Sequence, residues 1–261
     1  MSRVSSPGID VTRPNIARVY DYLLGGKDNF AADREQAERL LRVSPGIAQW
    51  ARDNREFVCA AAARAAREGG IAQFLDLGAG LPASPAVHEA ARAVIPGARF
   101  AVVDNDPVVV SHAQALLGKA EGLAPVMADL TEPEALLEHP DVKRVIDCGQ
   151  PTGIIIGGVA HFLPTARMRE VTAGYLSRAP SGSWLIISAG HAENDEVANR
   201  FRPVYAAAAT YRHSLADFAS FFHGAEIVPP GLVAARHWMA GLNAAPPSEG
   251  LYVLCGAGIK R

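Results

Sequence analysis

The sequence predicts an α/β protein built on an open, mostly parallel β-sheet, and three observations support this class. From Ile71 to the C-terminus, short apolar runs alternate with segments of helical periodicity, which is the pattern of a parallel sheet. The first of these runs ends in an acid followed by two glycines, as expected for a strand that enters a tight turn. A long helical stretch precedes that run, more than such a sheet needs. We therefore expect a helical cap or lid at residues 1–70 and the sheet-containing core at 71–261.

The predicted cap contains three helices separated by glycine or polar stretches. Apolar residues recur along each of them at helical spacing, which indicates one buried face per helix. Thr12 is suited to cap the first helix, and Gly25-Gly26 ends it. The helices are expected at about 14–24, 33–42 and 45–67, the last being one helix or two.

Seven segments of the predicted core have the composition of strands. The fourth is apolar throughout, so we expect it to lie near the centre of the sheet. Two of the later helices are expected at about 194–208 and 214–222. The strands are expected at 72–77, 99–104, 123–127, 152–159, 183–190, 225–229 and 251–256.

Residues 74–82, Phe-Leu-Asp-Leu-Gly-Ala-Gly-Leu-Pro, are the stretch that most directly predicts a ligand. The glycines permit backbone angles closed to other residues and let a ligand approach the main chain. Ser84 and Pro85 suit the N-cap and first position of a following helix, whose N–H groups would attract an anion. Asp76, two residues before Gly78, instead suits a ligand with an ammonium group, which a pyrophosphate lacks. A second strand ends in Asp104, where a carboxylate can hold two ribose hydroxyls.

At these residues the sequence resembles the class I S-adenosylmethionine (SAM) dependent methyltransferases, with Asp76, Gly78 and Gly80 in their glycine-rich first motif and Asp104 in their second. Three further stretches make it similar to a large actinobacterial family of such enzymes whose substrates are largely unassigned. The resemblance runs from about Arg13 to the C-terminus. The stretches are Tyr-Asp-Tyr-Leu-Leu-Gly-Gly-Lys-Asp-Asn-Phe (20–30), Val-Val-Asp-Asn-Asp-Pro (102–107) and Ala-Asp-Leu (128–130).

The resemblance implies a Rossmann-like, seven-stranded, doubly wound sheet of order 3-2-1-4-5-7-6, with an antiparallel final hairpin. It also implies SAM as the methyl donor and S-adenosyl-L-homocysteine (SAH) as the product, with the cap folded over the ligand. The acceptor would be a small molecule bound beneath that cap. The expected cofactor-binding residues are Asp76, Gly78, Ala79, Gly80, Asp104, Asn105, Asp129 and Leu130 from the core, with Tyr20 and Arg55 from the cap.

Several of these residues also have a purely structural interpretation. Asp104 could cap the next helix instead of binding ribose. Asp129 could cap the helix near Glu132 instead of accepting a hydrogen bond from the adenine amino group. Tyr20 could be a core residue, and Arg55, which could pair with the SAM carboxylate, could be a solvated helix charge.

His161 is the candidate catalytic residue because it follows the fourth predicted strand, where methyltransferases often present a group to the substrate. An imidazole with an ordinary pKa of about 6.5 suits proton removal. The alternative is a structural hydrogen bond at the strand end. In the cap, Tyr22 and the segment 27–29 (Lys-Asp-Asn) could also contact the ligand. His88-Glu89 do not predict a metal or acid–base pair, since adjacent helix residues point about 100° apart.

The composition limits the remaining possibilities. With 25 basic and 27 acidic residues and a net charge of −2, the chain has no charge signature of non-specific nucleic-acid binding. Its three cysteines are far apart, which suggests neither a disulfide framework nor a metal site and favours a cytoplasmic protein. No secretory signal or membrane-spanning run is visible. The apolar N-terminal helices could serve a homo-oligomer interface as readily as a lid.

Three alternatives to a small-molecule methyltransferase stay open. A protein that binds SAM without transferring its methyl group, as a sensor or scaffold, would keep the same motifs. An NAD(P)- or FAD-dependent oxidoreductase would also match the stretch 78–83 (Gly-Ala-Gly-Leu-Pro-Ala), although Asp76 and Pro82 disfavour a pyrophosphate site. A nucleic-acid methyltransferase is disfavoured by the near-neutral charge and by the lack of an Asn-Pro-Pro-Tyr or Asp-Pro-Pro-Tyr motif.

Overall fold

The computed structural model describes residues 10–201, 207–240 and 250–261. Its strands are β1 (Gln73–Leu77), β2 (Arg99–Asp104), β3 (Leu123–Met127), β4 (Gly153–Gly157), β5 (Trp184–Ala192), β6 (Glu226–Ile227), β7 (Val233–Ala234) and β8 (Leu251–Ile259). They form one sheet of order β3-β2-β1-β4-β5-β8-β6, with β7 paired to β8. β1 to β5 are parallel, and β8 runs antiparallel to β5, β6 and β7. Because β8 is the seventh predicted strand, the predicted order is confirmed, and the two-residue β7 is an addition.

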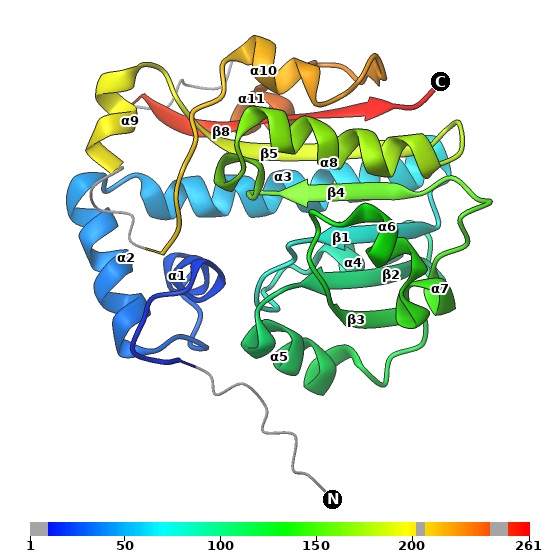
Figure 1. Cartoon of the computed structure of the whole chain (residues 1–261), viewed down its shortest axis with the longest axis horizontal. Coiled ribbons are helices and arrows are strands. Elements are labelled where there is room, and N and C mark those ends of the chain that lie inside the picture. The colour runs from blue at the N-terminus through cyan, green and yellow to red at the C-terminus, as the bar shows by residue number, and fades with distance from the viewer. Residues whose placement is uncertain (1–9, 202–206, 241–249) are drawn as a thin grey trace, which may run out of the picture.

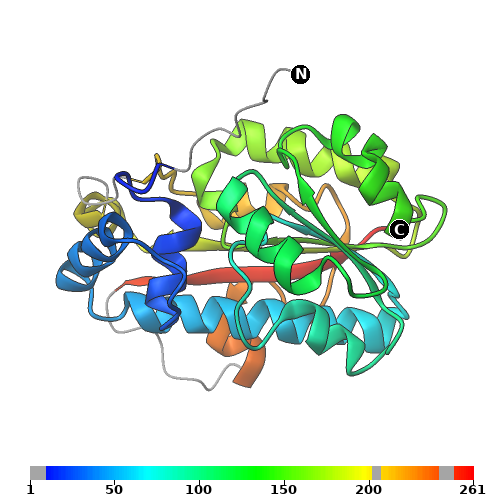
Figure 2. The same cartoon turned by 90° about the horizontal axis from the view of Figure 1, so that it is seen from below.

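Helices cover both faces of this sheet (Figures 1 and 2). α3, α4 and α11 pack on one face, and α6, α7, α8 and the turn after α10 pack on the other. The doubly wound arrangement expected from the sequence is therefore present. The helices are α1 (Ile16–Leu23), α2 (Ala31–Val43), α3 (Ile47–Gly69), α4 (Val87–Arg92), α5 (Pro107–Leu117), α6 (Pro133–Glu138), α7 (Pro140–Val145), α8 (Thr165–Arg178), α9 (Asp195–Phe201), α10 (Leu215–Ser220) and α11 (Ala235–Ala240), with a 3₁₀ turn, η1, at Ala160–Phe162.

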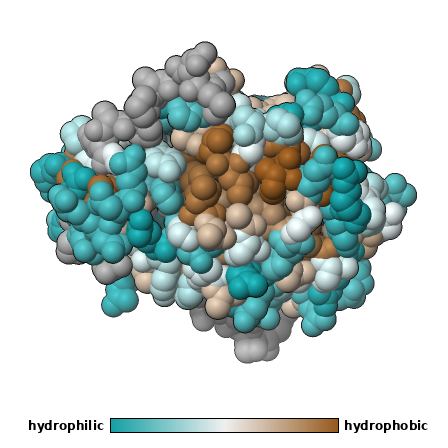
Figure 3. All heavy atoms as spheres, turned by 90° about the horizontal axis from the view of Figure 1, so that it is seen from above, coloured by the Kyte–Doolittle hydropathy of each residue, from teal (hydrophilic) through white to brown (hydrophobic). Residues whose placement is uncertain are grey.

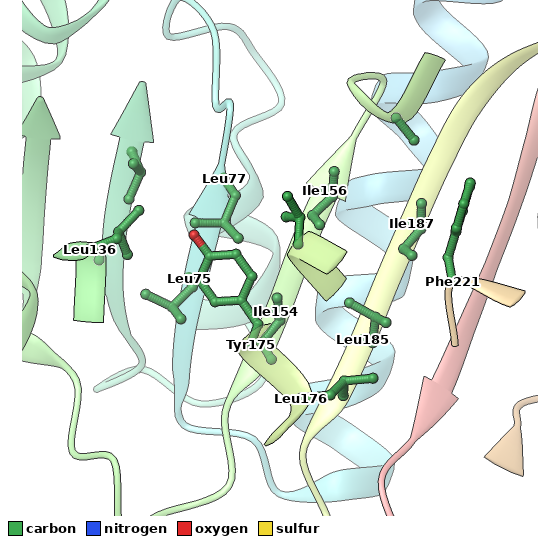
Figure 4. Close-up of a cluster of buried hydrophobic side chains, with 14 of the residues drawn as sticks. Leu75, Leu77, Leu136, Ile154, Ile156, Tyr175, Leu176, Leu185, Ile187 and Phe221 are labelled. Carbon is green, nitrogen blue, oxygen red and sulfur yellow. The ribbon is translucent and has the colours of Figure 1, made fainter. Parts of the chain in front are cut away.

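The core follows from the alternation of side chains along the parallel strands. On β4, Ile154 and Ile156 face α8 while Ile155 faces α3, and all three are buried. Figure 4 shows the α8 side, where Tyr175 lies across the β1 and β4 side chains. Burial of each such aliphatic side chain contributes about 1.5–3 kcal/mol, so this central strand anchors the edge of the sheet that carries the site.

The N-terminal helices form a separate apolar cluster at one end of the sheet (Figure 1). It includes Val19 of α1, Leu40 of α2 and Ile47 of α3, all buried. α3 is one helix of 23 residues, and its second half packs on the sheet. α3 therefore serves both the cap and the core, and the predicted boundary at residue 70 stays a prediction.

Two predicted helix starts are wrong. Thr12 does not cap α1, because its hydroxyl donates to Asp10 and the side chain of Asn15 instead accepts from the first turn. Ser84 and Pro85 do not begin the first core helix, since α4 starts at Val87 after the N-cap Ala86. The predicted helix at 194–208 is present over Asp195–Phe201 as α9; the predicted residues 202–206 lie outside the described residues, and 207–208 are not helical.

The described surface carries one further feature relevant to partners. Figure 3, which looks down on the side of the molecule where α10 lies, shows apolar residues gathered in a patch bounded by polar ones.

In the described ranges, no helix has both the length and the apolar character needed to span a bilayer.

Candidate functional site

The ten residues expected to bind the cofactor and the candidate catalytic residue His161 all line one cavity of about 420 Å³. Its floor is formed where β1 to β5 end, the position at which open parallel sheets bind ligands. Its roof comes from α1, α2 and the first turns of α3. The structure thus brings together residues that lie as far apart in the chain as Tyr20 and His161.

The glycine turn after β1 has the backbone angles that the sequence predicts. It does not form the anion-binding helix start that the sequence also suggests. Gly78 and Gly80 have φ angles of +70° and +68°, which other residues rarely adopt, and a Cβ on Gly78 would lie 2.7 Å from Cγ2 of Val159. The N–H groups of Gly78 and Ala79 both donate to the carbonyl of Val103, and that of Gly80 donates to Asp104. With the N–H groups of residues 78–80 used and α4 starting only at Val87, the turn does not run into the helix N-terminus against which a dinucleotide site holds its pyrophosphate. This argues against the dinucleotide alternative.

Asp76 presents a carboxylate that lacks a hydrogen-bond donor among the described residues. Burial raises the pKa of Asp76 to about 6, the nearby Asp104 adds to this, and the Arg55 guanidinium opposes it. Asp76 is half-buried at the cavity, and a carboxylate partly removed from water without donors is costly. A ligand ammonium group at this position would supply the missing hydrogen bonds and charge.

Asp104 is buried at the end of β2 and organises the backbone around it. Its Oδ2 accepts from the N–H of Gly80 (2.9 Å) and its Oδ1 from the N–H of Asp106 (2.9 Å). Burial raises the pKa of Asp104, and these hydrogen bonds counteract the shift. Asp106, not Asp104, caps α5, since its Oδ1 accepts from Val108. Each oxygen of Asp104 can accept a second bond, as a ribose diol requires, and Asn105 beside it lies exposed at the cavity.

Asp129 and Leu130 follow β3 and form another part of the wall. Oδ1 of Asp129 accepts from the N–H of Thr131 (2.8 Å), while the N-cap of α6 is Glu132. Asp129 therefore closes a local turn and does not cap the helix, which leaves its other oxygen without a described donor. The carbonyl of Leu130 accepts from the hydroxyl of Tyr175 on α8 (2.8 Å), so a core side chain fixes this segment. Sequence reasoning missed Tyr175, whose position in the chain gives no sign of this contact.

A chain of hydrogen bonds joins the cap to the strand ends. The hydroxyl of Tyr20 donates to the carbonyl of Ala51 (2.8 Å) and accepts from Nδ2 of Asn54 (2.9 Å). Oδ1 of Asn54 accepts from the Ser188 hydroxyl (2.5 Å), whose oxygen accepts from the N–H of Gly158 (2.9 Å). Burial raises the pKa of Tyr20 to about 12, so it remains a neutral hydroxyl. Asn54 and Ser188 were not predicted, because only the fold places them side by side.

Arg55 holds the loop that follows the glycine turn. Its Nε donates to the carbonyl of Pro85 (2.7 Å) and its Nη2 to that of Ala83 (2.9 Å). Nη1 has no hydrogen-bond partner in the described part of the chain. The expected pairing of Arg55 with a ligand carboxylate stays a prediction, but the residue is not the solvated helix charge of the alternative interpretation.

His161 lies in η1, just beyond β4, and its half-buried ring lines the cavity. Its Nδ1 accepts a hydrogen bond from the N–H of Gly190 (3.1 Å), and the rings of Trp50 and Phe162 pack against it with centroids 5.8 and 4.1 Å away. Burial lowers the pKa of His161 to about 3, with a smaller contribution from His213. Removal of a proton by His161 therefore meets two obstacles, a low basicity and an occupied Nδ1.

Other candidate ligand contacts of the cap point away from the cavity. The hydroxyl of Tyr22 donates to Glu38 on α2, and Nδ2 of Asn29 donates to Asp21. Asp28 donates its backbone N–H to the same carboxylate. The Gly-Gly-Lys-Asp-Asn segment is thus folded around Asp21, and residues 27–29 do not line the cavity.

His88 and Glu89 have separate structural roles, as expected. Glu89 accepts from the N–H of Ala86 at the start of α4, and His88 packs edge-on against Phe100. Across residues 10–201, 207–240 and 250–261, no group of three or more His, Cys, Asp or Glu side chains is placed to hold a metal ion.

Comparison with known proteins connects this site to a family. Residues 2–261 match the model of the S-adenosyl methyltransferase family. The fold is similar to a crystal structure of a candidate methyltransferase from Thermobifida fusca, with 35% identity over 100% of both chains and a TM-score of 0.88. It is also similar to a DUF574 family protein from Streptomyces avermitilis, with 33% identity over 97% of this chain and 100% of that one and a TM-score of 0.90. Among curated proteins, no match was found.

Proposed function

The chain belongs to the S-adenosyl methyltransferase family and is a SAM-dependent methyltransferase, and we propose that its acceptor is a small molecule held beneath the N-terminal helices. The single observation that supports this acceptor class is the continuous cavity that extends from the strand ends to the apolar cap. The net charge of −2 also disfavours a nucleic-acid acceptor.

The residues at the strand ends fit SAM on structural grounds. The carboxylate of Asp76, which has no described donor, suits its ammonium group, and the main chain at Gly80 is open to the cavity, since no protein atom lies within 4 Å of the place a Cβ would take there. We assign Asp104 to the ribose hydroxyls and Arg55 to the SAM carboxylate. The adenine would lie against Asn105, Asp129 and Leu130, with Ala79 and Gly80 along the main-chain side and Tyr20 above.

When bound, SAM supplies an electrophilic methyl group. The chain's own part is to bind and orient both reactants and to exclude water from between them. The cap suits that task because the Tyr20–Asn54–Ser188 hydrogen bonds tie α1 to the strand ends. We propose that the functional lid comprises α1, α2 and the first turns of α3.

Three further expectations belong to this proposal. A cytoplasmic location is expected from the widely spaced cysteines, and an actinobacterial origin from the sequence resemblance. A homo-oligomer would find an apolar surface in the patch of Figure 3. A SAM-binding protein without transferase activity would require the family's chemistry to have been lost in this chain, and no described residue at the strand ends suggests such a loss.

The donor site can be tested by thermal unfolding of the purified protein with SAM, SAH, NADH or no ligand. A ligand at about 100 times its Kd stabilises the native state by about 2.7 kcal/mol, a rise in Tm of about 5–10 °C for a chain of this length. We expect SAM and SAH to raise Tm and NADH to leave it unchanged. Asp104→Ala should abolish the rise.

Asp28→Ala is the matched control, because Asp28 is an exposed cap acid outside the cavity. It should keep the full rise in Tm with SAH. A rise with NADH alone, or an unchanged response of Asp104→Ala, would contradict the assignment of the strand ends to SAM.

A further inference from the structure

The end of the cavity beneath the cap is lined by hydrocarbon side chains. Leu23, Leu40 and Ile47 come from the three cap helices, and Phe201 and Leu251 face the same cluster from α9 and β8. If SAM occupies the strand ends, as the proposed function requires, this apolar end receives the acceptor. Most of the acceptor's surface is therefore apolar.

The acids that line the cavity all lie at the cofactor end. Asp76 and Asp104 lie on β1 and β2, and Asp106 and Asp129 follow β2 and β3, at the strand ends that the proposed function assigns to SAM. An acceptor with an ammonium group would therefore find no carboxylate among the described residues of the apolar end. An acceptor that must lose a proton would also find no carboxylate base there.

The other titratable side chains around the apolar end are poor bases as well. Tyr20 is a neutral hydroxyl that already donates to Ala51. Arg212 is a cation that donates to the carbonyls of Ala192 and Glu193 and pairs with the exposed carboxylate of Asp195. Tyr211 lies exposed at the rim. None of these three side chains is a carboxylate or a free base, so the described apolar end has no group suited to remove a proton from the acceptor.

His161 is the polar group best placed to meet the acceptor. Because Nδ1 accepts from the N–H of Gly190, the proton of the neutral ring resides on Nε2, and no described residue accepts a hydrogen bond from Nε2. The backbone is held as well, since the carbonyl of His161 accepts from the N–H of Tyr211 (2.8 Å). The ring is thereby a fixed N–H donor at the wall of the cavity.

From this arrangement we propose that the acceptor is an apolar carboxylic acid, that His161 binds its carboxylate through Nε2–H, and that methyl transfer converts this carboxylate to a methyl ester. The acid arrives ionised, so the site needs no base. A carboxylate oxygen forms the new O–CH₃ bond as the S–CH₃ bond breaks with its electron pair kept by sulfur. The negative carboxylate and the positive sulfonium become a neutral ester and SAH, and no proton is released.

The test uses the full chain saturated with SAH and three probes of equal length, octanoate, octan-1-ol and octylamine. Calorimetric titration at neutral pH should show octanoate binding about tenfold or more tightly than either of the others, as expected for a hydrogen bond to a charged group. In turnover with SAM, octanoate should yield its methyl ester without acidifying a weakly buffered solution.

Two variants test the role of His161. His161→Phe keeps a ring but removes the donor, and it should reduce the preference for octanoate over octanol to about threefold or less. His161→Gln keeps an N–H donor and should restore part of the preference. In both variants a rise in Tm with SAH reports that the fold and cofactor site are intact.

The outcomes separate this inference from the proposed function. Failure of SAH to raise Tm in the unmodified protein would contradict the proposed function itself. With SAH bound, three results would overturn only the carboxylic acid acceptor. These are no binding of octanoate at about 1 mM, equal or tighter binding of octanol or octylamine, or an undiminished preference in His161→Phe.

Discussion

The base of the cap and the floor of the cavity both hold carboxylates withdrawn from bulk solvent, fully at Asp33 and partly at Asp76, and the two carboxylates differ in their hydrogen-bond partners. In the cap, Asp33 accepts from Nε of Arg18 (2.8 Å) and from the N–H groups of Asn15 and Phe30, so both of its oxygens are satisfied. At the floor, Asp76 accepts no described hydrogen bond, and burial raises its pKa to about 6. Satisfied buried charges maintain architecture, whereas an unsatisfied one indicates a place for a ligand.

The largest loss of stability is expected for removal of a buried carboxylate in the cap. Asp33→Ala would leave the buried Arg18 guanidinium without its close partner, and Asp106, 3.9 Å away, cannot replace the lost hydrogen bonds. We expect the free energy of unfolding to fall by about 3–5 kcal/mol, measured by urea denaturation. Glu35→Ala on the same helix, whose partner Arg39 is exposed, should change it by less than about 0.5 kcal/mol. A similar small loss in both variants would break the comparison.

At the floor of the cavity, removal of the carboxylate charge is expected to stabilise the protein. Asp76→Asn removes a buried charge that the ligand-free protein does not compensate, so the free energy of unfolding at pH 7.5 should rise by about 1–3 kcal/mol. The same variant should bind SAH at least about tenfold more weakly, because the ammonium group loses its charged partner. Urea denaturation and calorimetric titration measure the two effects. A variant that is both less stable and unimpaired in binding would contradict the contrast with Asp33.

The pH dependence of the free energy of unfolding tests independently whether the Asp76 charge destabilises the folded protein. The pKa of Asp76 is higher in the folded protein than the ordinary value of 3.8, so the folded state binds this proton more tightly. This contribution to stability is fully present below pH 3.8 and is lost as the pH rises through about 6. The stability advantage of Asp76→Asn should therefore shrink as the pH falls from 7.5 towards 4. An advantage that is constant over this range would contradict the raised pKa.

The smallest effects concern two tyrosines two residues apart on α1. Tyr20→Phe removes the donor to Ala51 and the acceptor of Asn54, and it should cost about 1–2 kcal/mol of unfolding free energy and weaken SAH binding. Tyr22→Phe removes only an exposed bond to Glu38 and should cost less than about 0.5 kcal/mol with SAH binding unchanged. Urea denaturation and titration of both variants measure the difference. Equal effects would mean that the cap-to-sheet hydrogen bonds do not support the site.

Much of the fold could be predicted because its signals are local. Apolar runs and glycine punctuation placed β1 to β5 within a residue or two, while β7 was missed because two residues carry no periodic pattern. The start of α4 was misplaced because Ser84-Pro85 has the composition of a helix start, and the bonds from Arg55 that hold this loop come from a distant helix. Local preference is overridden where such tertiary contacts act on the backbone.

The sequence by itself determined the strand-turn motif, the acids at the ends of the first three strands and the family that they indicate. These depend on residues close together in the chain, whose backbone conformation follows from their own chemistry. Only the tertiary structure decided which polar groups stay unpaired. Asp33 receives hydrogen bonds on both oxygens, whereas Asp76 has no described donor. Hydrogen bonds connect Tyr20 through Asn54 to Ser188. His161, expected from the sequence to act as a base, is placed as a hydrogen-bond donor. Hydrogen bonding and burial are properties of neighbours in space, and these neighbours include segments as far apart in the chain as Asn54 and Ser188.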